Sequence, residues 1–363
     1  MEAFELADKV RYLDDTKLRT LSIDPKAMDS YEAGLALNSL KISKEITPEI
    51  YKSLEQTCSN LKLDIKNVNA YVTSSPEIQA GCMGFNKQKC VITVTSAIIN
   101  LLDFEEMKFV FGHELGHFLL NHNIEEIELQ ESKEGYIKKR AQEISVDRLG
   151  LMACKDINVA TGAIVKTLSG LDNKYMNFDM KAFLSQLDGD IVKNDNSSQY
   201  SSHPSFILRA KALIRFSLSD PYLQLTQESS GTHLKEIDKL IQDDLDTFTD
   251  KDLRIDIKMV KELVYFWGYA YAYVKDGEFS KEDQLNLEIK FDTKRTEKLK
   301  NMLRSFSSKD DVISNVKSKF VNSITDLKKI APNLAKKEIN LIIQEIAEDS
   351  GQKDLFKEIV IEI

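Results

Sequence analysis

Two histidines and a glutamate stand close together in residues 111–118, which read F-G-H-E-L-G-H-F. This is the H-E-x-x-H motif, and the apolar residues around it predict a helix. The four-residue spacing puts His113 and His117 on one helical face, where two neutral imidazoles can bind one metal ion. Zinc suits two imidazoles that are completed by a carboxylate. Glu114 would then be the general base for an attacking water. A buried polar face without function is the alternative, and it would be costly to bury among Phe, Leu and Val.

A zinc peptidase site needs a third protein ligand. The metzincin pattern is excluded, because Leu120 and Asn123 stand where its glycine and third histidine would be. The next predicted helix offers Glu143 and Asp147, which are four residues apart and share one face. By themselves they would suit a solvated acidic surface, but their place one helix after the H-E-x-x-H motif favours a metal site. Glu143 can bind the metal, and Asp147 can accept the second ring N–H of a ligating histidine, with His113 as the expected donor.

Helix-capping residues, alternating polar and apolar residues, and turn-forming residues predict the helices and strands that position these side chains. We expect helices over residues 48–60, 103–122 and 134–155, and the pair Asp103 and Glu106 predicts a capping box for the second of them. Alternating β-rich segments predict strands at 68–73 and 90–95, with a turn over residues 81–89 between them. We expect a polar loop over residues 188–202, and the pattern is helical from His233 onward. The fold class is therefore α+β and mostly helical, with an all-α second part.

Length and charge limit the possible classes of protein. The chain has 363 residues, which suggests two domains, and 49 basic against 58 acidic residues give a net charge of −9. This acidic balance argues against a nucleic-acid partner. We expect no signal peptide and no membrane span, because neither an apolar leader nor a long apolar run is present. Four scattered cysteines favour reduced thiols in the cytoplasm, although a disulfide between Cys82 and Cys90 is a possible alternative.

Three motifs in this order resemble the gluzincin metallopeptidases of the HtpX and CAAX-prenyl-protease family. They are V-F-G-H-E-L-G-H-F, E-I-S-V-D-R-L-G and S-H-P-S-F-I-L-R-A, and the resemblance covers residues 10–220. It implies a zincin-like fold with one zinc ion on His113, His117 and Glu143, and Asp147 behind the ligands. It also implies that His203 and Arg209 lie near the active site.

The resemblance implies two roles for His203, which either donates a hydrogen bond to the oxyanion or approaches the zinc and blocks the water site. Arg209 would neutralise the carboxylates or polarise the substrate carbonyl, with a simple salt bridge as the alternative. An edge strand near residues 90–95 would pair with an extended peptide substrate. Before this strand, relatives commonly carry Asn-Ala-Phe, whereas this chain has Gln79, Ala80 and Gly81. Many relatives also have membrane spans, which we do not expect in this sequence.

The remaining histidines and the second half carry no comparable cluster. His122 lies five residues after His117, off the metal-facing side, so we expect a structural role for it; His233 is expected to be solvated. Residues 275–288 and 332–345 share a loose pattern that resembles the helical TerB-like domains, with an ordinary helical bundle as the alternative.

The sequence therefore predicts a cytoplasmic zinc metalloendopeptidase that acts on protein or peptide substrates. Its expected parts are a metallopeptidase domain at 1–220, a linker at 221–234 and an all-helical domain at 235–363. Glu114, His203 and Arg209 are the expected catalytic residues. The alternative is a zinc-bound protein that is latent or proteolytically idle and that binds other proteins in a chaperone-like way.

Overall fold

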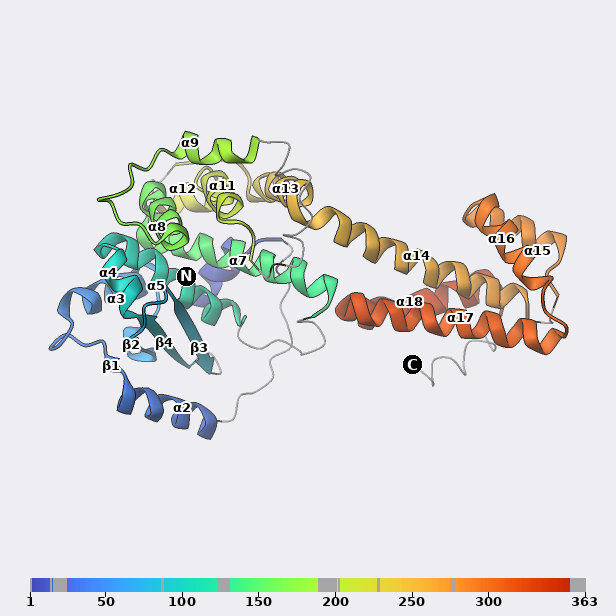
Figure 1. Cartoon of the computed structure of the whole chain (residues 1–363), viewed down its shortest axis with the longest axis horizontal. Helices are drawn as coiled ribbons and strands as arrows, with labels where there is room; N and C mark the ends of the chain where they lie inside the picture. The colour runs from blue at the N-terminus through green and yellow to red at the C-terminus, as the bar shows by residue number, and fades with distance from the viewer. Residues whose placement is uncertain are drawn as a thin grey trace. The chain divides into compact units, whose positions relative to one another are not determined.

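The structure is a computed structural model that describes residues 2–13, 15, 25–85, 88–122, 131–188, 201, 203–226, 229–275 and 278–352. It divides into two compact units, residues 1–125 with 136–251 and residues 126–135 with 252–363. Helices dominate both, and one small mixed sheet lies in the first, as the predicted fold class requires (Figure 1). In the part of the chain described, no helix is both long enough and apolar enough to cross a bilayer. Most of the polar loop expected at 188–202 lies outside the described residues.

The described elements, in chain order, are α1 (Ala3–Val10), α2 (Pro25–Asn38), β1 (Leu40–Lys41), α3 (Pro48–Asn60), η1 (Ile65–Asn67), β2 (Val68–Thr73), β3 (Ala80–Phe85), β4 (Lys89–Thr95), α4 (Ser96–Leu101), α5 (Phe104–Leu120), α7 (Lys133–Cys154), α8 (Ile157–Ser169), α9 (Met180–Leu184), η2 (Ser185–Asp188), α11 (Phe206–Phe216), α12 (Asp220–Thr226), α13 (Leu234–Leu245), the π-helical turn η4 (Asp246–Asp250), α14 (Lys251–Tyr273), α15 (Lys281–Lys290), α16 (Thr293–Leu303), α17 (Lys309–Ile330) and α18 (Pro332–Asp349).

The sheet has the strand order β1-β2-β4-β3, with β2 and β4 parallel and the other two pairs antiparallel. Because side chains alternate along a strand, each strand supplies both faces. One face, including Ala70 and Ile92, joins the large core around α5. On the other face Tyr71 and Val91 form a smaller cluster with Met28 of α2. The sheet is therefore buried on both sides, between α2 and the helices of the main core.

Two expectations for the sheet were wrong. Residues 81–85, expected in a turn, belong to β3, which pairs with β4 through Ala80–Phe85. Glycines suggested a turn there, but an edge strand with one unpaired side tolerates them. The second error follows from the first. The strand expected to be an edge, residues 90–95, lies between β2 and β3, so the free edge on this side of the sheet belongs to β3.

Two thiols, one on β3 and one on β4, face each other. The Sγ atoms of Cys82 and Cys90 lie 3.0 Å apart, and none of the four cysteines of the chain forms a disulfide. Burial raises the pKa of Cys90 well above its ordinary value, and the neighbouring Cys82 raises it further. The Cys90 thiol therefore stays protonated on the core side of the sheet.

The central helix α5 begins with the predicted capping box, because the Asp103 carboxylate accepts from the N–H groups of Glu105 and Glu106, and the Glu106 carboxylate accepts from the N–H of Asp103. Its residues Phe111 and Leu115 are fully buried. Helix α5 is thus buried nearly all round, which explains why it carries apolar residues on most sides.

The second unit has its own core, built from α14 to α18. The aromatic segment of α14 supplies Phe266, Tyr269 and Tyr271 to this core, where they meet Phe320 of α17 and Ile346 of α18. The boundary between the units falls at residues 251 and 252, later than the expected linker at 221–234. That stretch contains α12 and the start of α13, and a bridge pairs Ser219 with Thr232.

Candidate metal centre

Close packing of α5 against α7 brings the two sequence motifs together. A Cβ atom on Gly112 would lie 2.5 Å from the Cβ of Ala153, and one on Gly116 would lie 3.0 Å from the Cβ of Val146. Gly150 of α7 makes a similar close approach to Phe109. Only glycine lets the backbones come this near. The small residues therefore set the distance between the histidines of α5 and the carboxylates of α7.

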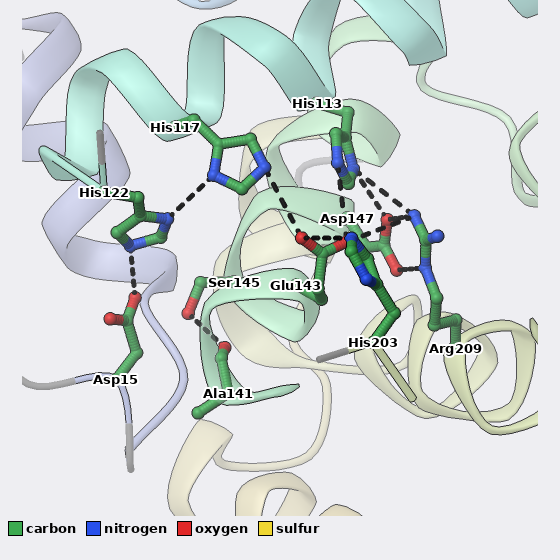
Figure 2. A network of polar contacts seen from close by, with 10 residues as sticks. All are labelled: Asp15, His113, His117, His122, Ala141, Glu143, Ser145, Asp147, His203 and Arg209. Carbon is green, nitrogen blue, oxygen red and sulfur yellow. Dashed lines mark hydrogen bonds and ion pairs between the residues drawn. The ribbon is translucent and has the colours of Figure 1, made fainter. Parts of the chain in front are cut away.

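Three side chains converge with their donor atoms directed at one point (Figure 2). His113 Nε2 lies 3.6 Å from Glu143 Oε2, and His117 Nε2 lies 3.6 Å from Glu143 Oε1. One donor atom from each of the three residues can be chosen so that all lie within 4.8 Å of one another. The predicted ligands are therefore within reach of a single ion.

The donor set fits zinc in chemistry as well as in position. Two imidazole nitrogens and one carboxylate are a ligand set that zinc uses at catalytic sites. Glu143 is buried, and its Oε2 has no hydrogen-bond partner among the described residues. A buried carboxylate oxygen without such a partner is costly, and a bound cation would remove that cost.

Asp147 supports the first histidine from behind. Its Oδ1 lies 2.9 Å from His113 Nδ1, and Arg209 donates to both carboxylate oxygens, from Nε at 2.8 Å and from Nη2 at 2.6 Å. Burial would raise the pKa of Asp147, but the charge and hydrogen bonds of Arg209 and the contact with His113 lower it to about 2. Asp147 is therefore ionised at neutral pH, and as an acceptor it keeps the proton of His113 on Nδ1 and leaves Nε2 free for a metal.

His113 and Glu143 line a cavity of about 420 Å³. Its lining includes Ala80 at the start of β3, Ile98, Glu114, Glu143, His203 and Arg209. Glu114 is buried, and burial together with the nearby charge of Glu143 outweighs the opposing charges of His113 and Arg209, so that its pKa rises to about 7. A carboxyl group with such a pKa exchanges protons readily at neutral pH.

His203 lies across the ligand group from α5. Its Nε2 is 3.5 Å from Glu143 Oε1, the same oxygen that His117 faces, and its side chain is 60% exposed. Arg209 also reaches Glu143, with Nη2 at 3.8 Å from Oε2. The structure thus brings together all seven predicted site residues: His113, Glu114, His117, Glu143, Asp147, His203 and Arg209.

Sequence reasoning missed two residues behind the site. His122, expected to have a structural role only, lies with Nδ1 3.2 Å from Nδ1 of His117, and its Nε2 lies 3.0 Å from Asp15. The one available signal was Asn121, because asparagine often ends a helix in the left-handed conformation and turns the next residue back onto the last turn. Asp15 gave no signal, since it lies 107 residues from His122 along the chain.

This small mixed sheet beside two packed helices, with two histidines and a glutamate converging beside one cavity, defines a zincin-like domain. Residues 45–134 match the sequence model of Peptidase family M48. The resemblance expected from the motifs is thereby confirmed.

Three similar proteins extend this match. The plastoglobule-localized metallopeptidase 48, chloroplastic, of Arabidopsis thaliana is 24% identical over 221 residues, which cover 53% of this chain and 63% of the relative. The protease HtpX homolog of Helicobacter pylori (strain Shi470) is 30% identical over 87 residues, which cover 24% of this chain and 27% of the relative. The protease HtpX homolog of Arthrobacter sp. (strain FB24) is 29% identical over 86 residues, which cover 23% of this chain and 29% of the relative. The chain thus matches less than two thirds of each relative's length. No solved structure matches it significantly.

Proposed function

We propose that this chain is a zinc metalloendopeptidase that hydrolyses peptide bonds in protein or peptide substrates. The observation that carries this proposal is the convergence of His113 Nε2, His117 Nε2 and the Glu143 carboxylate beside a cavity that also holds Glu114. The match to Peptidase family M48 supports the same reaction class. Zinc, when bound, would polarise the scissile carbonyl and lower the pKa of a water molecule.

The residues of the chain then have distinct tasks. A carboxylate oxygen of Glu114 takes a proton from the attacking water and delivers it to the nitrogen of the leaving amine. His203 donates from Nε2 to the oxygen that becomes negative in the transition state. Asp147 holds His113 in one tautomer, and the charge of Arg209 keeps Asp147 ionised.

The free edge of β3 is the proposed place for the substrate backbone. The cavity is lined by Ala80, the first residue of this strand, and by Gln79 before it. An extended peptide that adds to an exposed strand is held by main-chain hydrogen bonds, which do not depend on side-chain identity. The substrate class is therefore extended protein segments of varied sequence. We propose the cytoplasm as the compartment on the basis of the scattered cysteines alone.

Replacement of Glu114 by glutamine tests the proposal. Because the amide cannot take a proton from water, we expect Glu114→Gln to lower kcat on an unfolded protein substrate by about 100-fold or more. Zinc content, measured by elemental analysis, should stay at one equivalent. The matched control is Glu105→Gln, which changes an exposed glutamate in the first turn of the same helix. A chelator should abolish cleavage by the wild type, and wild-type cleavage that persists without zinc would refute the proposal.

A latent enzyme is the second candidate, and one observation favours it. His203 Nε2 already points at the ligand group and lies 3.5 Å from Glu143 Oε1. In that position the imidazole would compete with water for the metal. An idle, zinc-bound binding protein is the outcome if the wild type binds one zinc ion and neither the wild type nor a His203 variant cleaves any substrate.

A further inference from the structure

The C-terminal end of α5 places a second imidazole against a predicted ligand. Asn121 adopts the left-handed conformation with φ 63° and ψ 46°. The N–H of His122 then donates to the carbonyl of His117 at 2.9 Å, and the N–H of Asn121 donates to that of Phe118 at 3.2 Å. This is the Schellman pattern, in which the residue after the left-handed one packs back onto the last helical turn. An apolar pair often fills that contact, whereas here it joins two imidazoles.

These two rings belong to a chain of three side chains (Figure 2). His117 Nδ1 and His122 Nδ1 lie 3.2 Å apart, and His122 Nε2 lies 3.0 Å from Asp15 Oδ2. The side chains of His122 and Asp15 are almost fully buried, at 3% and 0% exposure. Water therefore does not replace either contact, and each nitrogen depends on its protein partner.

Asp15 is itself held in place from two sides. Arg11 Nη1 lies 3.2 Å from Asp15 Oδ1 and donates to the Asp15 carbonyl oxygen at the same distance. The N–H of Tyr12 donates to Ser145 Oγ at 3.0 Å, which ties this segment to α7 between Glu143 and Asp147. Asp15 is thus a fixed acceptor beside the site, and Arg11 already supplies one positive charge to it.

The positions of the protons follow from these contacts. A carboxylate accepts only, so His122 Nε2 carries a proton and donates it to Asp15. One proton lies between the two facing Nδ1 atoms. If it is on His122, His117 accepts it and must carry its own proton on Nε2, where it cannot bind a metal. If it is on His117, His122 accepts it and His117 Nε2 presents a lone pair toward Glu143.

We propose that Asp15 and His122 are positioning residues that fix His117 in its Nδ1–H tautomer and thereby prepare Nε2 for zinc. The inference rests on the proposed zinc site. The two predicted histidine ligands are then supported in similar ways. His113 contacts Asp147, which pairs with Arg209. His117 contacts His122, which connects it to Asp15 and Arg11. The histidine-to-carboxylate contact behind a ligand is thus direct in one case and relayed by a second imidazole in the other.

Two substitutions of His122 separate the two contacts. Asparagine places an amide oxygen near the Nδ1 position and keeps an acceptor for His117, but it does not reach Asp15. Glutamine places its amide near the Nε2 position and keeps the contact with Asp15, but it loses the acceptor for His117. A purely structural role in anchoring Asp15 would favour glutamine, whereas the proposed role favours asparagine.

The test measures zinc affinity of the full-length chain, stripped of metal, by competition with a chromophoric chelator. We expect His122→Gln and Asp15→Asn to weaken the zinc Kd by about 10-fold to 100-fold, and His122→Asn to stay within about threefold of the wild type. The control His233→Gln changes an exposed histidine at the start of α13 and should have no effect. Cobalt substitution gives a second readout, because the visible spectrum should change in His122→Gln and not in His122→Asn.

The outcomes are distinguishable. A wild type that binds no zinc would overturn the proposed function and the relay together. A wild type that binds zinc, with Asp15→Asn and His122→Gln equal to it, would overturn the relay alone. Equal losses in His122→Asn and His122→Gln, or a larger loss in His122→Asn, would show that His122 acts only in packing, even where both variants unfold at a lower temperature than the wild type.

Discussion

His203 is the exposed member of an otherwise buried group, and its replacement separates its two expected roles. As an oxyanion donor, it acts mainly in the transition state. We therefore expect His203→Ala to lower kcat by about 100-fold while the zinc Kd and KM change little. The measurement is steady-state cleavage of a fluorogenic peptide together with a zinc titration. A rise in kcat/KM would instead identify His203 as a block on the water site and favour the latent enzyme.

At the scale of single residues, spacing predicted what lies on one helical face and missed what depends on a turn. His113 and His117 are four residues apart, and so are Glu143 and Asp147. Each pair therefore occupies one side of its helix, as the structure shows. His122 is five residues after His117, and on a continuous helix it would point elsewhere. The left-handed residue Asn121 ends the helix and reverses that direction, which no periodicity argument can reveal.

At the scale of elements, the glycines of α5 control how near α7 can come. We expect Gly112→Ala to force the two helices apart, because its Cβ would meet the Cβ of Ala153 at 2.5 Å and the backbone of Gly150 at 3.0 Å. Overpacking costs about 1–3 kcal/mol, which exceeds the gain of about 1 kcal/mol from alanine in a helix. Urea unfolding should show a lower stability, and the zinc Kd should weaken.

The matched control is Gly34→Ala in α2, where an added Cβ would meet nothing within 4 Å. That variant should be neutral or more stable by up to about 1 kcal/mol, with an unchanged zinc Kd. Equal behaviour of the two variants would contradict the role given to Gly112.

A carboxylate on helix α2 forms hydrogen bonds and an ion pair with residues of the sheet. Glu32 accepts from Asn69 at 2.6 Å and from Tyr71 at 3.1 Å, and it pairs with Lys89. Burial would raise the pKa of Glu32, but Lys89 and Tyr71 outweigh it and lower the pKa below the ordinary value. A lowered folded-state pKa stabilises the protein above the unfolded-state pKa, and this contribution disappears as the pH falls through the folded-state pKa.

We therefore expect hydrogen exchange in α2 to accelerate as the pH falls below the usual glutamate range, after correction for the intrinsic pH dependence. Glu32→Gln should unfold more easily at neutral pH, by about 1 kcal/mol, and its difference from the wild type should shrink in acid. A difference that stays constant from pH 7 to pH 3 would disprove the proposed contribution of charge.

The sequence predicted elements well where local rules decide them. Residues 48–60 and 68–73 have the predicted limits, since a proline start and strict alternation are local signals. Strand β3 was missed because its glycines resemble a turn, and only pairing with β4 shows that the segment is extended. The order of the strands, and with it the free edge, depends on contacts between segments and could not be read from alternation.

At the scale of the whole molecule, each unit has a core of its own, and the predicted ligands all belong to the first. Trp267, the single tryptophan, packs in the second core. Zinc at 100 times its Kd should stabilise the first unit by about 2.7 kcal/mol. We expect urea unfolding followed by hydrogen exchange in α5 to shift with zinc, whereas the transition followed by Trp267 fluorescence stays in place. Equal shifts by both probes would show that the units unfold as one.

The burial of the four thiols has a practical consequence for labelling. Burial raises the pKa of Cys58 and of Cys154 to about 12, and it raises that of Cys90 as well, so these three are poor nucleophiles at pH 8. Cys82, on the edge strand β3, is the one cysteine that is not fully buried. A maleimide dye would therefore attach at a single position, two residues from the cavity wall, and would report by fluorescence when a peptide lies along that strand.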